Sequence, residues 1–204
     1  MEQSNLMAMA ELYREAYPNY PPLVVHGNWL YGVWELGNNY KGSGFYGSYP
    51  NGYLRRVMCM FPDVKSILHL FSGSLPPGPY TRFDCHEQPD YFNNLYHGDV
   101  IGDAHELSRC FPTLRFDLVL ADPPYTKEDA KRYGTPMVNR AKVMREVAKV
   151  VYSGGWLVWL DTVKPMYRKS EWVLRGEIAV VGSTNHRVRM CFIFQRGGEN
   201  NVEV

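Results

Sequence analysis

The 204-residue sequence lacks several features that would point to particular classes of protein. Its four cysteines (Cys59, Cys85, Cys110 and Cys191) form no CxxC pair, so neither a disulfide scaffold nor secretion is indicated. No charged-then-apolar leader opens the chain, and no apolar run approaches the roughly 20 residues that span a bilayer. The six histidines show no paired ligand spacing and no HExxH motif. We therefore expect a cytoplasmic protein without a membrane segment or a metal site.

Charge and composition leave the partner open. The net charge is +1 and the isoelectric point about 7.7, which neither requires nor excludes a polyanionic partner, because basic residues can still gather on one face. With 45% hydrophobic residues, a chain of this length can bury one core but is short for two domains. The 15 tyrosines exceed what a core alone needs, since their polar tips favour a wet or ligand-facing position.

Alternating apolar runs and connections beyond residue 63 indicate a mostly parallel sheet covered by helices. We expect strands over 66–71, 80–84, 96–101, 116–121, 156–160, 175–181 and 187–195, and helices over 1–17, 53–61, 127–133 and 138–152. The last two strands are joined by a short turn and should pair antiparallel. The last helix should end in a glycine cap at Ser153-Gly154-Gly155. Residues 24–49 should form a hairpin or ordered loop, with pieces 28–36 and 44–49 flanking Gly37-Asn38-Asn39.

The most informative motif is Asp122-Pro123-Pro124-Tyr125, directly after the apolar run 116–121. Open α/β sheets place their ligands at the carboxyl ends of strands, so this motif occupies a favourable position. Asp122 offers only acceptors and can hold the N–H of an amino group. Pro123 and Pro124 stiffen the turn and offer carbonyl oxygens, and Tyr125 offers a flat face for a displaced base. A strand-end Asp followed by a proline turn is the purely structural alternative.

This tetrapeptide resembles the catalytic motif of DPPY-type amino-methyltransferases, above all the small phage and bacterial DNA adenine-N6 enzymes. Three further stretches are similar to that family: 68–74 (LHLFSGS), Gly102-Asp103-Ala104 and 159–162 (WLDT). The resemblance covers roughly residues 46–196 and depends mainly on the tetrapeptide. It implies a Rossmann-like class I fold with a mostly parallel seven-stranded sheet and an antiparallel carboxyl-terminal hairpin. The methyltransferase domain would span 49–196, after a helical and aromatic-rich extension at 1–48 and before a flexible tail at 197–204.

The resemblance also implies S-adenosyl-L-methionine as the cofactor and assigns residues to it. Phe71, Ser72 and Gly73 match the family's cofactor loop, whose glycine lets the backbone approach the ligand. Asp84 matches the acidic residue that holds the ribose hydroxyls. Asp103 and Ala104 match the position that contacts the cofactor adenine, although Asp99 competes for that role.

Two departures from the family matter. Only residues 72–79 separate the first two strands, and they include three prolines, so we expect an irregular loop in place of the usual crossover helix. Lys41 or Arg55 would then have to neutralise the cofactor carboxylate in place of a helix N-terminus. There is also no insert large enough for a target-recognition domain, so recognition should depend on loops.

The favoured substrate is nucleic acid, DNA over RNA, with methylation at adenine N6. Lys127, Lys131 and Arg132, together with Tyr49, are the foremost substrate-binding candidates, because the three basic residues follow Tyr125 closely. Weaker candidates are aromatic (Trp29, Tyr31, Trp34 and Tyr46) or basic (Arg140, Lys164, Arg168, Lys169, Arg187 and Arg189). The alternatives are methylation of RNA at adenine N6 or guanine N2, and an inactive subunit that binds nucleic acid. A glutamine amide is a less favoured target, because that family usually has Asn where this chain has Asp122.

Overall fold

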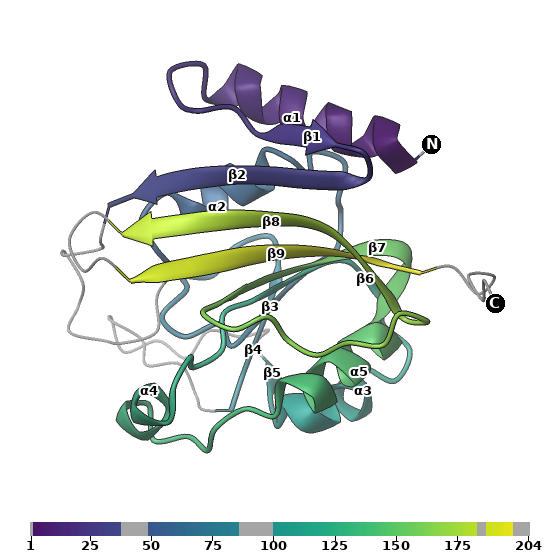
Figure 1. Ribbon diagram of the computed structural model, residues 1–204. Coiled ribbons are helices and arrows are strands. Elements are labelled where there is room, and N and C mark those ends of the chain that lie inside the picture. Colours follow the sequence, from purple (N-terminus) through teal and green to yellow (C-terminus); the bar gives the residue numbers. More distant parts are fainter. Residues whose placement is uncertain (1, 38–48, 86–99, 183–186, 198–204) are drawn as a thin grey trace.

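One mixed sheet organises the chain, for which the computed structural model describes residues 2–37, 49–85, 100–182 and 187–197. Its described part has nine strands in the order β1-β2-β8-β9-β7-β6-β3-β4-β5 (Figure 1). Their bounds are β1 Val24–His26, β2 Trp29–Leu36, β3 Ile67–Leu70, β4 Thr81–Asp84, β5 Val100–Ile101, β6 Phe116–Ala121, β7 Val151–Asp161, β8 Trp172–Gly182 and β9 Val188–Arg196. All pairs are parallel except β1 with β2 and β9 with both of its neighbours.

The seven strands predicted from the sequence correspond to β3–β9, and the antiparallel hairpin β8–β9 is confirmed. The prediction of seven strands is wrong in number, because β1 and β2 extend the sheet to nine. β2 pairs parallel to β8 from Leu30, opposite Gly176, to Leu36, opposite Gly182. The residues of β2 alternate between exposed and buried, which is the pattern of a strand with one face on a core.

Helices cover the two faces of the sheet (Figure 1). Their bounds are α1 Glu2–Ala16, α2 Tyr53–Met58, the 3₁₀ turn η1 Ala104–Glu106, α3 Leu107–Cys110, α4 Lys127–Arg132 and α5 Arg140–Val150. β6 lies between two cores: Leu118 and Leu120 pack in the cluster that contains α1 and α2, and Val119 and Ala121 pack in the cluster that contains α5. A strand buried on both faces reads as a continuous apolar run, which explains why its bounds were predicted correctly. Within the described residues, no helix is both long and apolar enough to cross a bilayer.

Arg56 of α2 holds the amino-terminal segment in place through contacts with three tyrosines. Arg56 of α2 is 5% exposed, and its Cζ lies 4.3 Å from the ring centroid of Tyr20 and 4.8 Å from that of Tyr17. It also donates a hydrogen bond to the hydroxyl of Tyr13 in α1. A guanidinium stacks well on aromatic faces because it is planar and weakly hydrated. These contacts connect α1 to α2.

One turn was not predicted, and one local prediction is wrong. The chain turns at Gly27-Asn28 between β1 and β2, where Gly27 has φ +57°. The hairpin or loop predicted around Gly37-Asn38-Asn39 includes 38–48, which lie outside the described residues. The predicted glycine cap is absent, since α5 ends at Val150 and β7 begins at Val151. Gly154 has φ +80° inside β7, where the pairing with β6 shifts register between Phe116 and Leu118. Its left-handed backbone serves a bulge, which requires glycine for the same reason as a helix cap.

The connection between β3 and β4 is irregular, as predicted, with no helix in residues 71–80. Arg82 Nη1 donates to the carbonyl of Leu75 at 2.5 Å, and the Tyr80 hydroxyl donates to the carbonyl of Pro76. The predicted strand 96–101 is described only from Val100 onward.

Candidate active site

The predicted site residues follow strands that end at one edge of the sheet. β6 leads into Asp122, β3 into Phe71 and β4 ends at Asp84. Because these strands are parallel neighbours, their carboxyl ends share an edge, where α/β proteins bind ligands. β9 runs antiparallel to β7, so its beginning, near Arg189, reaches the same edge.

Asp122 is the central group of this edge. Burial raises the pKa of its carboxyl group from 3.8 to about 7, and buried Asp161 adds to the rise. A hydrogen bond from the Tyr125 hydroxyl and the positive charge of Arg189 oppose it. A carboxyl group with a pKa near neutrality can accept hydrogen bonds as an anion or hold a proton. The hydrogen bond between the Tyr125 hydroxyl and Asp122 was not predicted from the sequence motif.

Tyrosines wall the site on the α2 side. The rings of Tyr49 and Tyr53 are stacked, with centroids 5.6 Å apart, and Tyr49 is 8% exposed. Burial raises the pKa of both hydroxyls well above 10, and the nearby charge of Asp122 raises them further. Behind them, His69 Nδ1 lies 3.4 Å from the Tyr49 hydroxyl, and burial lowers the pKa of His69 to about 4. The structure thus brings Tyr49, predicted as a substrate contact, to the site.

Two arginines of the β9 end approach Tyr125. The Cζ atoms of Arg189 and Arg187 lie 5.4 Å and 5.9 Å from the centroid of the Tyr125 ring. Arg187 also forms an ion pair with Asp129 of α4, at 3.2 Å. The Nε of Arg189 is buried and has no hydrogen-bond partner among the described residues. Sequence reasoning ranked these arginines low because the fold, and not their position in the chain, brings them to Tyr125.

The higher-ranked basic residues Lys127, Lys131 and Arg132 lie exposed on α4. This helix begins directly after Tyr125, at the N-cap Thr126, whose hydroxyl accepts a hydrogen bond from the backbone nitrogen of Asp129 at 3.1 Å. An N-cap of this kind fixes where a helix begins. The three cationic side chains thus lie on the element that follows the Asp122–Tyr125 turn.

The Phe71–Gly73 loop has a special backbone. Phe71 has φ +62°, the one positive φ of a non-glycine residue in the described chain, and Gly73 has φ +50°. Asp84 fixes the loop, because its Oδ2 accepts from the nitrogen of Gly73 at 2.9 Å and its Oδ1 from the nitrogen of Cys85 at 2.8 Å. The hydroxyl of Ser72 is buried without a hydrogen-bond partner among the described residues. Strain and an unsatisfied buried polar group together are typical of a ligand site.

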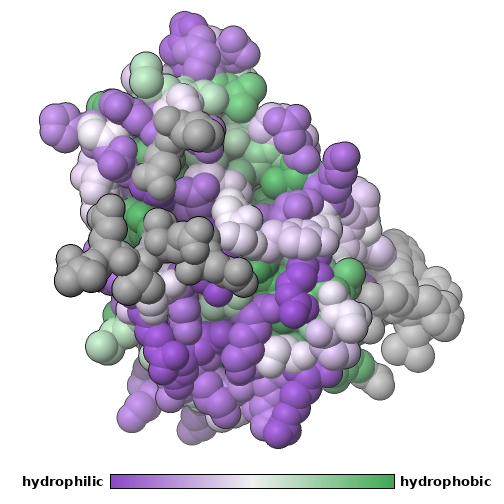
Figure 2. Space-filling model, turned by 90° about the vertical axis from the view of Figure 1, so that its right-hand side faces the viewer, coloured by the Kyte–Doolittle hydropathy of each residue, from purple (hydrophilic) through white to green (hydrophobic). Residues whose placement is uncertain are grey.

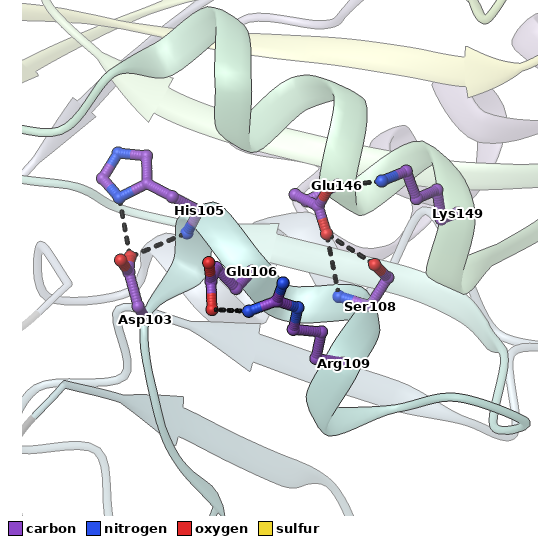
Figure 3. Close-up of polar contacts among 7 residues, drawn as sticks. All are labelled: Asp103, His105, Glu106, Ser108, Arg109, Glu146 and Lys149. Carbon is purple, nitrogen blue, oxygen red and sulfur yellow. Dashed lines mark hydrogen bonds and ion pairs between the residues drawn. The ribbon is translucent and has the colours of Figure 1, made fainter.

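Asp103 caps the η1 turn (Figure 3). Its Oδ1 accepts from the backbone nitrogen of His105 at 2.8 Å and lies 2.6 Å from His105 Nδ1. The hydrogen bond from the His105 backbone lowers the pKa of Asp103. Its side chain is 62% exposed, whereas Ala104 is buried. Asp103 therefore has a local structural role beside the contact predicted for it, and its competitor Asp99 lies outside the described residues.

Other predicted contacts are buried, lie away from this edge or are already paired. Trp34 is fully buried in the core, so its prediction as a recognition residue is wrong. Trp29 and Tyr31 are exposed and stacked on each other, with centroids 6.1 Å apart, but they lie toward the beginning of β2, away from the edge that carries Asp122. Arg140 is bound to buried Asp161, which makes it unavailable to phosphates. Lys41 and Tyr46 lie outside the described residues.

The remaining weak candidates are exposed. Lys164 is paired with Glu177, Arg168 lies 3.3 Å from Glu171, and Lys169 and Arg55 are also exposed. In the part of the chain that the structure describes, no three His, Cys, Asp or Glu side chains are grouped as a metal ion would require.

A groove lies at the opposite edge of the sheet. Figure 2 shows apolar surface between hydrophilic side chains on one face of the molecule. This groove of about 440 Å³ is lined by α1 and by the beginning of β7, including Met9, Phe61 and Trp156. None of the predicted site residues lines it. It is therefore separate from the Asp122 edge.

Comparison with known proteins supports the fold. No family model and no curated protein matches the sequence. Among solved structures, TrmN from Thermus thermophilus matches with a TM-score of 0.52 and 16% identity, over 74% of this chain and 50% of that one. The chain thus spans half the length of TrmN. It has a Rossmann-like methyltransferase fold. The predicted fold class is confirmed, while a fold alone does not establish a reaction.

Two further structures match less closely. A putative methyltransferase from Streptococcus mutans gives a TM-score of 0.48 at 9% identity, over 95% of this chain and 82% of that one. The putative methyltransferase yhhF from Escherichia coli gives 0.44 at 16% identity, over 76% and 90%.

Proposed function

We propose that the protein is an S-adenosylmethionine-dependent methyltransferase that acts on an exocyclic amino nitrogen, with adenine N6 in DNA as the favoured target. The observation that carries the proposal is the desolvated carboxyl group of Asp122, hydrogen-bonded to Tyr125. Asp122 directly follows β6, whose neighbour β3 leads into the strained Phe71–Gly73 loop. The similarity of the Asp122–Tyr125 motif to DNA adenine-N6 enzymes favours DNA over RNA.

The residues of the β3 and β4 ends fit the cofactor. The hydroxyl of Ser72, which has no hydrogen-bond partner among the described residues, is available for a polar ligand, and Gly73 leaves room for the backbone to approach one. Asp84 accepts one backbone hydrogen bond on each oxygen, and a carboxylate offers about four acceptor sites. It can therefore bind the ribose hydroxyls without releasing Gly73. Asp103 and Ala104 would border the cofactor adenine. When bound, the cofactor supplies a methyl group on a good sulfonium leaving group.

The remaining chemistry falls to the Asp122–Tyr125 turn. In the proposed reaction, Asp122 accepts an N–H of the target amine, together with the Pro123 carbonyl, and so directs the nitrogen lone pair away from the ring. This interaction matters most in the transition state, because conjugation with the ring is lost there. With a pKa of about 7, Asp122 can then hold the proton that the methylated nitrogen releases. Tyr125 supplies a ring on which the base stacks.

Lys127, Lys131 and Arg132 would bind phosphates beside this turn, and Tyr49 would line the base pocket. Phosphate binding by exposed cations releases counterions, so affinity for DNA should fall steeply with salt. A salt-independent complex with one long recognition sequence would contradict this part of the proposal.

The experiment is methyl transfer from labelled S-adenosylmethionine to matched DNA and RNA oligonucleotides, followed by identification of the modified base. Wild-type protein should bind the cofactor without added metal and should label adenine in DNA. Asp122→Ala should lower kcat by at least about 10²-fold with nearly unchanged cofactor affinity. Asp63→Ala, at an exposed position of the groove beside α1, is the matched control. Labelling of RNA alone would show that RNA, and not DNA, is the substrate. Absence of cofactor binding would reject the proposal.

A further inference from the structure

Three elements of the site meet at one arginine. Arg140 is the first residue of α5, and its Nε donates to Asp161 Oδ2, at the end of β7, at 2.7 Å. Its Nη2 donates to Asp161 Oδ1 at 3.1 Å and to the carbonyl oxygen of Tyr125 at 2.9 Å. One side chain therefore connects α5 and β7 to the Asp122–Tyr125 turn.

The partner of Arg140 is itself held firmly. Asp161 is fully buried and also accepts hydrogen bonds from Trp159 Nε1 at 3.1 Å and from the backbone nitrogen of Thr162 at 2.7 Å. With donors on several sides, its carboxylate has one orientation, and the planar guanidinium fork of Arg140 must match it. The Arg140 side chain is 18% exposed. The Tyr125 carbonyl is thus held by a group that is itself immobilised.

The beginning of α5 is also connected to the side of the site proposed for the cofactor. Asn139 is the N-cap of α5 and directly precedes Arg140, and its backbone nitrogen donates to His105 Nε2 at 2.9 Å. His105 Nδ1 in turn bonds to Asp103 (Figure 3). A series of hydrogen bonds along the start of α5 therefore leads from Asp103 to Tyr125.

We infer that Arg140 is a positioning residue, which holds the Asp122–Tyr125 turn in a fixed place relative to the Asp103 side of the site. Arg140 acts through Tyr125 and Asp161 and contacts neither of the proposed ligands. Its effect on turnover rests on the proposed function, but its effect on the turn does not. A displacement of about 1 Å in a catalytic group can cost about 10²-fold in rate, so this contact should matter for methyl transfer.

The first test is amide hydrogen exchange of the unliganded protein. Arg140→Lys keeps a cation near Asp161 but loses the two-pronged geometry, and the double variant Arg140→Met/Asp161→Asn removes both charges, so that no buried ion remains unpaired. In both, peptides covering 122–134 should exchange at least about tenfold faster, while 116–121 in β6 should be unchanged. Arg145→Met, on the same helix, is the control and should exchange like wild type.

The second test separates positioning from stability. The double variant should show a kcat reduced at least about tenfold, with affinity for S-adenosylhomocysteine within about twofold of wild type, because the link from Asp103 to Asn139 is intact. If the Arg140–Asp161 pair served stability alone, a double variant with the wild-type thermal midpoint would show wild-type amide exchange and wild-type kcat. That result would overturn the inference. If the wild-type protein bound no S-adenosylhomocysteine, the proposed function would fail, and the exchange data would still decide the role of Arg140.

Discussion

Replacing Asp122 by asparagine should make the protein more stable and inactive. The carboxyl group of Asp122 has its pKa raised from 3.8 to about 7 by burial, whereas in the unfolded chain it ionises near 3.8. Between these pH values the native state keeps the proton and the unfolded state releases it. Ionisation therefore favours the unfolded state, and the contribution of Asp122 to stability falls as pH rises from about 4 to about 7.

The size of this effect follows from the pKa values. A tenfold change in the dissociation constant corresponds to about 1.4 kcal/mol, so a rise from 3.8 to about 7 corresponds to at most about 4 kcal/mol. Asparagine has nearly the same shape, can still accept the hydrogen bond from Tyr125, and does not ionise. The Asp122→Asn variant should therefore gain up to about 4 kcal/mol of unfolding free energy over wild type above pH 8, and little below pH 4.

Urea unfolding of both proteins at a series of pH values between 4 and 8.5 measures this difference. Subtracting the two curves removes the contributions of all other titrating groups, provided that the m-values agree. Methyl transfer should be lost in the variant at every pH. A stability difference that does not depend on pH would refute the reasoning, because it would show that the carboxyl group is not desolvated in the native state.

Three further predictions concern the same edge. The pKa of His69 is lowered to about 4 by burial, so in urea unfolding the stability of wild type relative to His69→Gln should fall by about 3 kcal/mol as pH falls from 6.5 to 4; a difference that does not change with pH would contradict this. Tyr125→Phe should keep much of the activity that Tyr125→Ala loses, because stacking is worth roughly 1 to 3 kcal/mol; equal loss in both would make the hydroxyl bound to Asp122 the essential group. Arg189→Met removes a positive charge that lowers the pKa of Asp122, so the acidic limb of its kcat/KM profile should move to higher pH; an unmoved limb would contradict this coupling.

The sequence predicted β6 and the turn that follows it because that part of the fold is locally encoded. β6 is buried on both faces, so its apolar run had clear limits, and the charged and proline-rich turn after it was conspicuous. Gly154 illustrates the opposite case. Its positive φ could serve a helix cap or a bulge, and only the pairing of β7 with β6 decides between them.

Contacts between distant residues were beyond sequence reasoning. Arg140 and Asp161 are 21 positions apart, and nothing in the sequence indicates that they pair until the fold places the start of α5 beside the end of β7. Arg189 reaches Tyr125 only because β9 runs antiparallel to its neighbours. Residues 28–36 were predicted only as part of a hairpin or ordered loop, because the parallel strand that Trp29–Leu36 adds beside β8 depends on the assembled sheet. These are the features that carry the proposals on positioning and charge.

Asp122 directly follows β6, and Asp161 ends the neighbouring parallel strand β7. Their surroundings nevertheless suit them to different tasks. Asp161 receives two hydrogen bonds from Arg140 and others from Trp159 and Thr162, so its carboxylate is held in place and can serve as a fixed anchor. Asp122 accepts a hydrogen bond from Tyr125 and lies in a desolvated position that disfavours its charge. An under-compensated carboxylate gains most from a new donor such as an amine N–H. In the proposed reaction, part of the stability that the native state loses at Asp122 would return when the target amine binds.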